Sequence, residues 1–354
     1  MSHDSGSAHP GNENLGNENL GKPKLAITVG DAAGIGPELA LQAAAAPQVL
    51  QIAQPLLVGP AAVLRRVAQQ LDLPLPPVLD REMIAARKWP SESASIVSVG
   101  DLEATNVQPG SFSAATGWAS FQAVDQSIAW ARAGVIDGIV TGPIQKEAWH
   151  AAEAPFLGHT ELLADRCGID EYCMMLTGSE CSTVLVTIHQ PLVDAIASLS
   201  VASIERAIRL AGQAMQKRHQ RSPRITVLGL NPHAGENGLI SHGEEERLIQ
   251  PAIDRVRAWS QQQGWQWQIT DPVPPDTAFT PAMRRQTDVH VCMYHDQGLI
   301  PLKALSFDDG VNVTLGLPIV RTSVDHGTAM DLAWQGTASV TSMLSAISLA
   351  AELA

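Results

Sequence analysis

Short β-type runs alternate with amphipathic stretches along most of the chain, and this rhythm constrains the fold more than any other feature of the sequence. The run LAITVG (25–30) precedes a helical pattern that starts at Pro37, and PLLVG (55–59) precedes AAVLRRVAQQL (61–71). Such alternation is typical of βαβ units, whose strands form a largely parallel sheet. We therefore predict an α/β protein with helices on the faces of its sheet.

The same pattern continues toward the C-terminus. Further strands are predicted at GIVTG (138–142), STVLVTIH (182–189), RITVLGLN (224–231), VHVCMYH (289–295) and VNVTLGL (311–317). Apolar residues three and four positions apart predict helices at 114–133, 203–219 and 244–262. In the first of these helices, we expect the aromatic side chains of Trp118 and Phe121 to lie in the core. The Pro-rich segment DPVPPDT (271–277) is predicted to be a loop, because proline lacks the N–H group that a central strand needs.

Composition narrows the class of protein. A chain of 354 residues with 45% hydrophobic residues can form two packed α/β lobes. The formal net charge of -13 argues against a nucleic-acid or anionic membrane surface, so a phosphate site would have to be a local pocket. The four cysteines form no CxxC pair, which favours a reducing, cytoplasmic location. No apolar run reaches the roughly 18 residues of a membrane span.

The first 23 residues differ from the rest of the chain. They contain a tandem GNENL repeat at 11–20 and are rich in Gly, Asn and Ser. This composition buries too little apolar surface to offset the entropy cost of ordering, so we predict a disordered tail at 1–23. The segment also lacks the apolar core and basic start of a secretory signal.

Three histidines follow strands in the same way. His189 ends VLVTIH, His233 follows VLGLN in NPHAGE, and His295 ends VCMYH. In open α/β sheets, ligands bind beyond the carboxyl ends of the strands, so these three side chains can converge on one crevice. Three neutral imidazoles suit a divalent metal and leave room on it for substrate. For any one of them, a hydrogen-bonded histidine at a strand end is the alternative.

Eight short motifs follow one another along the chain: GDAAGIGPE (30–38), TGPIQKE (141–147), GHTE (158–161), TIHQP (187–191), GLNPHAGE (229–236), PDT (275–277), MYHDQG (293–298) and VNVTLGLPIVRTSVDHGTA (311–329). In these motifs and their order, the chain resembles the 4-hydroxythreonine-4-phosphate dehydrogenase family from about Leu25 to the C-terminus. Each motif alone is weak, but eight in the family's order are very specific. The resemblance implies a two-lobed α/β/α fold like that of isocitrate and isopropylmalate dehydrogenases, with the active site in the interdomain cleft. By this likeness, 24–148 plus 316–354 form the first lobe, and 149–315 form the second, which carries metal ligands and dimer contacts.

The resemblance also implies roles for individual residues. His189, His233 and His295 would bind one divalent ion, zinc, magnesium, manganese or cobalt, with His295 reaching across from the partner subunit of a homodimer with shared active sites. The expected substrate contacts are His159, Thr160, Lys303, Asn312 and Arg321. A helix start near Thr160 favours anions, and two cations beside apolar runs suit a phosphate pocket better than a solvated surface.

The expected cofactor is NAD, with NADP as the alternative. The segment VDHGTA is similar to the adenine-side loop of the isocitrate dehydrogenase superfamily, so the expected cofactor contacts are Asp325, His326, Gly327, Thr328 and Ala329. GDAAGIGPE is not a GxGxxG fingerprint, and we interpret it as a turn that shapes the floor of the cleft. The catalytic candidates are Lys303 as a proton shuttle, and Asp276 and Asp296 as orienting carboxylates. A turn cap is the alternative role for either aspartate.

The activity implied is oxidation of 4-phosphohydroxy-L-threonine to 2-amino-3-oxo-4-phosphooxybutanoate, which decarboxylates to 3-amino-2-oxopropyl phosphate in pyridoxal 5'-phosphate synthesis. Alternative substrates are 4-phospho-D-threonate and 4-phospho-D-erythronate. A cis-dihydrodiol is disfavoured, because Lys303, Asn312 and Arg321 would have no phosphate to bind. A metal-dependent phosphoester hydrolase and a non-catalytic binding protein are the alternatives of other classes.

Three positions depart from the family's pattern or vary within it. Ala32 stands where proline is usual, which loosens a turn without removing a chemical group. Gln145 stands where asparagine or histidine is expected, so a polar contact changes there. Leu157 precedes GHTE at a position where relatives vary, and no inference rests on it.

Overall fold

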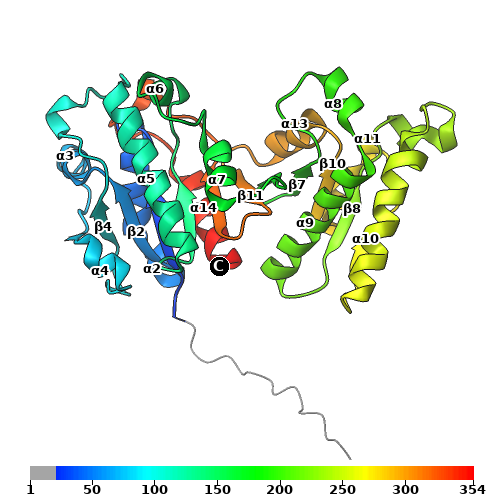
Figure 1. Cartoon of the computed structure of the whole chain (residues 1–354), viewed down its shortest axis with the longest axis horizontal. Helices are drawn as coiled ribbons and strands as arrows, with labels where there is room; N and C mark the ends of the chain where they lie inside the picture. Colours follow the sequence, from blue (N-terminus) through cyan, green and yellow to red (C-terminus); the bar gives the residue numbers. More distant parts are fainter. Residues whose placement is uncertain (1–20) are drawn as a thin grey trace, which may run out of the picture.

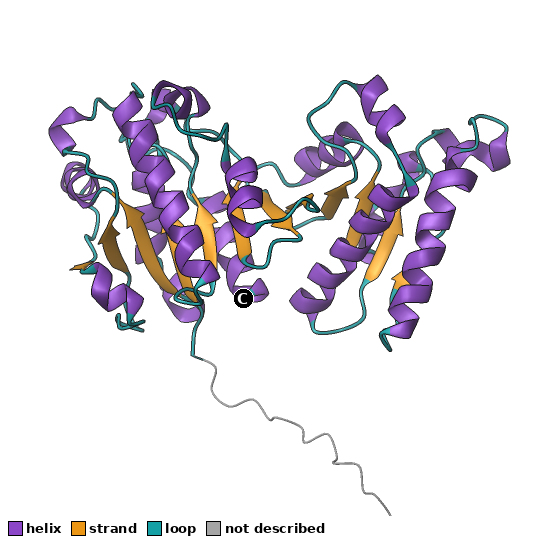
Figure 2. Ribbon diagram, viewed as in Figure 1, coloured by secondary structure: helices purple, strands orange, loops and turns teal. Residues whose placement is uncertain are grey.

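The computed structural model describes residues 21–354, and its strands form one twelve-stranded sheet that crosses the whole molecule (Figure 1, Figure 2). Their order in the sheet is β3-β4-β2-β1-β5-β12-β11-β6-β7-β10-β8-β9. The strand bounds are β1 Lys24–Thr28, β2 Gln54–Gly59, β3 Val78–Leu79, β4 Ser95–Ser98, β5 Gly138–Thr141, β6 Cys173–Thr177, β7 Ser182–Leu185, β8 Arg224–Val227, β9 Gln268–Ile269, β10 Val289–Cys292, β11 Val311–Leu315 and β12 Val320–Val324. Apart from residues 21–23, the tail predicted at 1–23 lies outside the described residues.

Two parallel groups of strands meet at an antiparallel centre. Eight of the eleven strand pairings are parallel, which confirms the predicted α/β class. The exceptions are β11, which is antiparallel to both β12 and β6, and the β6–β7 pair. The centre of the sheet is therefore where the β1–β5 group, extended by β12, joins the β7–β10–β8 group.

Helices cover both faces of this sheet (Figure 2). Their bounds are α1 Gly36–Ala45, α2 Pro47–Ile52, α3 Ala61–Leu71, α4 Arg81–Ala85, α5 Ala114–Arg132, α6 Lys146–Ala151, α7 His159–Cys167, α8 Leu192–Ser198, α9 Val201–His219, α10 Gln250–Gln262, α11 Pro275–Ala278, α12 Pro281–Arg285, α13 His295–Leu305 and α14 Thr341–Leu353. Short 3-10 segments lie at η1 Ala104–Asn106, η2 Pro232–Gly238 and η4 Met330–Leu332, and η3 Glu245–Ile249 is a π-helix. No helix within residues 21–354 has the length and apolar content needed to cross a lipid bilayer.

Alternate residues of the buried strand β1 face two different hydrophobic clusters. Leu25 and Ile27 pack in the cluster that includes α1 and α14, whereas Ala26 packs in the cluster that includes α5 and α7. Successive strand residues point to opposite faces, so a fully apolar strand requires a covered sheet on both sides. This is why the continuous apolar runs in the sequence predict a sheet between two helical layers.

In helix α5 the local sequence sets the start of the helix. The prediction that its aromatic side chains lie in the core is confirmed for Phe121 and wrong for Trp118. The Ser113 hydroxyl accepts the Thr116 N–H, and the Thr116 side chain accepts the Ser113 N–H, so a capping box starts the helix at Ala114. Phe121 is buried as expected. Trp118 is 43% exposed and stacks on Phe121 instead of entering the core, because it lies at the edge of the apolar stripe.

Several predicted strands are shorter than their apolar runs. The run 182–189 is a strand only to Leu185, and His189 lies beyond it with φ at 45°. The Pro-rich segment is a loop only at 271–274, where Val273 forms a bridge to Leu228, and Pro275 then starts α11. Proline suits the first turn of a helix, since its missing N–H would have no partner there. The runs therefore extend past the sheet into the segments that carry the candidate ligands.

The division into lobes at 148 and 316 stays a proposal, because one sheet continues through the molecule. Helix α7 packs against α5, and its Leu162 and Leu163 share a cluster with Ala26 of β1. Figure 1 shows α6 and α7 beside α5, while α8, α9 and α10 surround the β7–β10–β8 group. The described residues of α7 thus pack with the β1 half of the sheet.

Candidate functional site: a buried arginine pocket and a histidine edge

The three candidate histidines follow three neighbouring parallel strands. Strand β10 pairs in parallel with β7 on one side and with β8 on the other. His189 follows β7, His295 follows β10, and His233 follows β8. Carboxyl ends of adjacent parallel strands lie at the same edge of a sheet. The structure therefore places all three segments at one edge, which we call the histidine edge.

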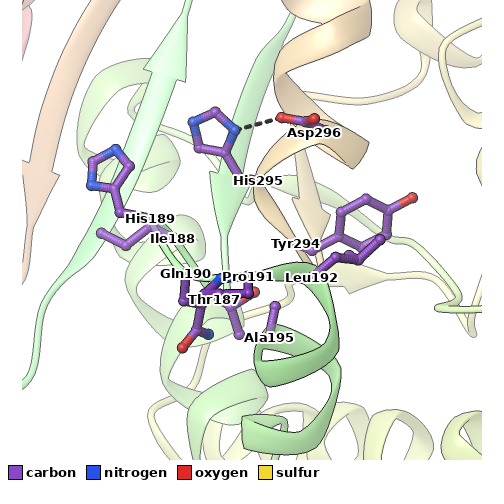
Figure 3. A pocket seen from close by; sticks show the side chains of 10 residues that line it. All are labelled: Thr187, Ile188, His189, Gln190, Pro191, Leu192, Ala195, Tyr294, His295 and Asp296. Carbon is purple, nitrogen blue, oxygen red and sulfur yellow. Dashed lines mark hydrogen bonds and ion pairs between the residues drawn. The ribbon is translucent and has the colours of Figure 1, made fainter.

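Two of these histidines lie side by side. The ring centroids of His189 and His295 are 5.7 Å apart, and both rings line a hollow of about 470 Å³. The Nδ1 atom of His295 is 2.7 Å from Oδ1 of Asp296. Figure 3 shows this bond on the side of the His295 ring that faces away from His189. When Nδ1 is protonated, it donates a hydrogen bond to the carboxylate. The lone pair on Nε2 is then free to bind a metal ion.

His233 lies on a turn of unusual backbone conformation. Six consecutive residues, 233–238, have positive φ angles between 46° and 85°. For residues other than glycine this left-handed conformation costs roughly 1–2 kcal/mol each. The His233 side chain is 64% exposed, and its Nδ1 atom is 3.7 Å from Oε2 of Glu236. Strained backbone of this kind is concentrated at functional sites, where surrounding contacts must hold it.

The donor chemistry at this edge fits a divalent metal, but one chain does not assemble the complete set of ligands. Partial loss of solvent, and then the nearby His295 and Lys146, lower the pKa of His189, so its imidazole favours the neutral form that binds metals. Within residues 21–354, no three His, Cys, Asp or Glu side chains of one chain are grouped to hold an ion. The structure pairs His189 with His295 of the same chain and leaves His233 apart. The assignment of all three as ligands, with His295 from a partner subunit, stays a proposal.

A second site is built around Arg321 on β12, which is only 4% exposed. Its Nη2 donates to the Thr141 hydroxyl at 2.7 Å and its Nη1 to the Thr314 hydroxyl at 3.1 Å. In the described part of the chain, these hydroxyls are its only hydrogen-bond partners, and its Nε has none. Burial lowers the pKa of Arg321 to about 10, so it is still charged at neutral pH. A buried cation held by neutral groups suits an anionic ligand.

His159 belongs to the same site, which we call the Arg321 pocket. Its ring packs edge-on against the buried Trp149, with centroids 5.9 Å apart. Its Nε2 is shielded from solvent and has no hydrogen-bond partner in the part of the chain that the structure describes. Burial, followed by the charges of Arg321 and Lys146, lowers the pKa of His159 well below 6.5. His159 and Thr160 are the first residues of α7, where free N–H groups favour anions. His159 is therefore within range of the charge of Arg321, and Thr160 follows it in the first turn of the helix.

Lys303 and Asn312 form hydrogen bonds with residues other than Arg321 and His159. The Lys303 ammonium group donates to Oδ2 of Asp325 at 2.6 Å, so a substrate candidate is paired with a cofactor candidate. Asn312, on β11, donates its side-chain N–H to the sulfur of Met174 at 3.4 Å. Asp276 is exposed on α11, which packs against η2, the segment of His233. The roles of these residues stay proposals.

The loop 325–329 rests on the turn that precedes α1. The Ile35 N–H donates to the Thr328 carbonyl at 3.0 Å, and a Cβ on Gly34 would lie 2.7 Å from that carbonyl oxygen. The Thr328 hydroxyl donates to Oε1 of Gln145 at 3.0 Å, and Ala329 has a φ of 39°. Among the described residues, the His326 ring has one hydrogen-bond partner, the Gly327 carbonyl, which accepts from Nδ1 at 2.9 Å. The segment GDAAGIGPE therefore supports this loop, and its glycine allows the close approach.

Sequence reasoning missed several residues that complete these sites. Thr141 and Lys146 belong to TGPIQKE, a motif that contributed to the resemblance but whose residues received no role beyond the note on Gln145. Position within a motif, next to a strand end, was the available signal. The same signal applies to Gln297 in MYHDQG, whose Oε1 accepts the Met293 N–H at 2.7 Å and whose Nε2 donates to the Gly229 carbonyl at 2.8 Å. This buried amide ties the segment of His295 to the segment of His233.

Comparisons with known proteins agree with the motifs. The family model "Pyridoxal phosphate biosynthetic protein PdxA" matches residues 51–350. The 4-hydroxythreonine-4-phosphate dehydrogenase of Desulforapulum autotrophicum is 41% identical over 331 residues, covering 93% of this chain and 95% of that protein. The D-threonate 4-phosphate dehydrogenase of Cupriavidus necator is 40% identical over 332 residues, covering 94% and 97%.

A solved structure shows the same fold. The crystal structure of 4-hydroxythreonine-4-phosphate dehydrogenase from Klebsiella pneumoniae has a TM-score of 0.81 and 37% identity, and the match covers 95% of this chain and 99% of that one. The fold implied by the motifs is thereby confirmed as a mixed α/β fold with one large sheet. Family model, relatives and fold agree over nearly the whole chain, and the chain therefore belongs to the PdxA family, the 4-hydroxythreonine-4-phosphate dehydrogenases that its motifs resemble.

Proposed function

We propose that this protein oxidises 4-phosphohydroxy-L-threonine with NAD to 2-amino-3-oxo-4-phosphooxybutanoate, which then decarboxylates to 3-amino-2-oxopropyl phosphate in pyridoxal 5'-phosphate synthesis. The observation that carries the proposal is Arg321, a buried cation whose only partners among the described residues are two threonine hydroxyls. A phosphate group supplies the missing negative charge and can accept two parallel N–H bonds from a guanidinium. The names of the relatives support the same substrate class.

In this proposal the Arg321 pocket holds the phosphate end of the substrate. Arg321 and the N–H groups at the start of α7 bind the phosphate oxygens, with Thr160 at that helix start. His159, whose pKa is lowered, stays neutral and donates one hydrogen bond from Nε2, the ring nitrogen that has no partner among residues 21–354. Lys146, whose charge acts on both His159 and His189, lies between the two sites and attracts the carboxylate of the same substrate.

The histidine edge holds the hydroxyl that is oxidised. His189, His233 and His295 would bind one divalent ion, with ligands drawn from both subunits of a homodimer. When bound, that ion would withdraw electrons from the hydroxyl oxygen and later from the ketone, while the nicotinamide takes up the hydride. Asp296 fixes the ring of His295 through its 2.7 Å contact with Nδ1. Asp276, on the helix next to the His233 turn, orients the same ligand set.

Proton transfer and cofactor binding involve the Lys303–Asp325 pair. Lys303 is the proposed proton shuttle, and Asp325 holds its ammonium group in place. Asn312 contributes an amide to the substrate side. The loop Asp325–Ala329, supported by Gly34 and Gln145, would hold NAD or NADP against the mouth of the cleft. Its backbone and the Thr328 hydroxyl would position the nucleotide without a glycine-rich fingerprint.

A second candidate substrate is 4-phospho-D-threonate. It is favoured by one specific observation, the 40% identity to a D-threonate 4-phosphate dehydrogenase, nearly equal to the 41% found for the first relative. In this acid a hydroxyl replaces the amine next to the carboxylate, so the Arg321 pocket and the histidine edge would be used in the same way. Only the contact to the amine or hydroxyl distinguishes the two substrates.

The test is NADH formation by the purified protein with added divalent metal, on 4-phosphohydroxy-L-threonine, 4-phospho-D-threonate and 4-phospho-D-erythronate in parallel. We expect the highest kcat/KM with the amino acid. Preference for an acid without the amine would support the dehydrogenase activity but show that the proposed substrate is wrong. Release of inorganic phosphate without NADH would instead show a metal-dependent phosphoester hydrolase and overturn the proposal.

A further inference from the structure

The His233 turn, residues 232–238, cannot keep its conformation by local preference. Its residues 233–238 all have positive φ, and four of them are not glycine. An isolated peptide of this sequence would leave the left-handed region, because each Cβ then crowds the following carbonyl oxygen. Something outside the turn must therefore hold it.

A buried carboxylate lies where such a support is needed. Glu245, 3% exposed, accepts the backbone N–H groups of Leu230 at 2.9 Å and Asn231 at 2.8 Å through the same oxygen, Oε1. Its other oxygen accepts the Asn231 side chain at 3.1 Å. The hydrogen bonds thus fix the segment that leads into the His233 turn, and no Lys or Arg of residues 21–354 forms an ion pair with this carboxylate.

Two glycines let the turn wrap closely around this carboxylate. A Cβ on Gly235 would lie 2.7 Å from Oε2 of Glu245, and a Cβ on Gly229 would lie 2.8 Å from the Cα of Ala234 and 3.3 Å from Oε1 of Glu245. Glu245 also begins the π-helix η3, a widened turn that is frequent at functional sites. The contact between the turn and the carboxylate is therefore tight on both sides.

We propose that Glu245 is a positioning residue that sets the affinity of the histidine edge for a divalent cation by holding His233 in place. This inference rests on the proposed function, in which His233 is a metal ligand. Glu245 does not touch the ion in this proposal. It acts through the backbone of Leu230 and Asn231, and without it the turn relaxes and the His233 ring loses its fixed position.

The experiment is calorimetric titration of the full-length, metal-free protein with Zn²⁺, alongside the visible absorption spectrum of the Co²⁺-loaded protein. Glu245→Ala should weaken Zn²⁺ binding by about 10- to 100-fold, the usual effect of losing a group that orients a metal ligand. Glu245→Gln should lose clearly less affinity than Glu245→Ala, because its amide oxygen can still accept both backbone N–H groups while its NH2 group cannot accept the Asn231 side chain. Glu246→Gln, at the exposed neighbouring position, removes the same charge and should leave affinity unchanged.

A pair of glycine substitutions separates the role of Glu245 from backbone strain alone, and replaces the alanine variant should that fail to fold. Gly235 and Gly238 both have positive φ, 79° and 85°, but a Cβ at Gly238 would meet nothing within 4 Å. Gly235→Ala should reproduce the loss of Zn²⁺ affinity and alter the Co²⁺ spectrum, whereas Gly238→Ala should have a much smaller effect. Equal losses from both would overturn the proposal.

Failure of the inference can be distinguished from failure of the proposed function. If the wild-type protein binds Zn²⁺ and Glu245→Ala and Gly235→Ala bind it equally well, Glu245 has no positioning role, and the metal site stands. If the wild-type protein binds no Zn²⁺ or Co²⁺, the proposed metal chemistry fails and the inference falls with it. Hydrogen exchange of the 229–238 peptide in the metal-free protein should be faster in Glu245→Ala and unchanged in Glu246→Gln; unchanged exchange in both would count against the inference.

Discussion

The Arg321 pocket and the histidine edge lie in the same molecule but are built differently. Arg321 extends from the middle of the sheet, is 4% exposed, and is held by hydroxyls of the adjacent strands β5 and β11. The histidines lie past the ends of β7, β8 and β10, in segments with left-handed backbone at His189 and His233. In the first site, one chain places the charge of Arg321 within range of His159, whereas the second brings only two of its three rings together.

The difference shows two ways of positioning a functional side chain, on a strand within the sheet or on a loop beyond it. A side chain rooted in a sheet has its position fixed by the strand ladder, so the protein can bury an uncompensated charge there and leave it for a ligand. A side chain on a loop needs additional support, which Glu245 and Gln297 supply at the histidine edge. We expect the first site to tolerate little change in its residues, and the second to depend on metal and on a partner subunit.

Removing the metal should have the largest effect on activity, and it should affect the histidine edge but not the Arg321 pocket. We expect a chelator, or the substitution His189→Asn, to lower kcat/KM on the order of 1,000-fold or more. The reason is that a bound ion would stabilise the charge of the transition state by several kcal/mol. Binding of the phosphorylated substrate at the Arg321 pocket should persist, measured by calorimetry without metal. His219→Asn, on the exposed end of α9, is the control and should keep activity. Full turnover in chelator would remove the histidine edge from the mechanism.

Replacing Arg321 should have the next largest effect. Arg321→Met should lower kcat/KM by about 100-fold, since hydrogen bonds to charged groups contribute roughly 1.5–3 kcal/mol each. Arg321→Lys should recover little of the kcat/KM that Arg321→Met loses, because an ammonium group cannot form the two parallel N–H bonds of a guanidinium. The melting temperature should change little, as a buried unpaired charge contributes no net stability. Normal kinetics and a lowered melting temperature in Arg321→Met would show that Arg321 has only a structural role. The control is Arg255→Met, at an exposed position.

The smallest effect is a pH dependence that arises from His159. Burial lowers the pKa of His159 well below the 6.5 of an unfolded chain, so the unfolded state binds more protons below pH 6.5. Stability should therefore be lost as pH falls through about 6.5 toward the lowered pKa of the folded protein, and should be present above it. The melting temperature of wild type should fall more than that of His159→Gln between about pH 7.5 and pH 5.5.

Arg321 and His159 should also be coupled in solution. The charge of Arg321 is the second cause of the lowered pKa of His159, so Arg321→Met should raise that pKa toward its ordinary value. An NMR titration of the His159 ring measures the change. An unaltered pKa would show that Arg321 does not contribute to the lowered pKa of His159.

The sequence by itself determined the α/β class, the family and the segments that carry the candidate ligands. Strand and helix periodicity, and apolar runs followed by Gly, Pro or His, are local properties of the chain, so they are visible before folding. The three histidines were expected just past strand ends that can converge on one crevice. The structure shows that the strands they follow, β7, β10 and β8, are adjacent and parallel. The motifs were likewise sufficient to identify the PdxA family.

Only the tertiary structure decided which groups meet and in what electrostatic setting. Thr141 reaches Arg321 across 180 residues of sequence, and Lys303 pairs with Asp325, because strand order brings distant segments together. The left-handed turn at His233 and its support by Glu245 have no periodic signature, since they depend on one buried carboxylate and two glycines in close contact. Burial gives Arg321 and His159 their lowered pKa values, and burial is a property of the whole fold.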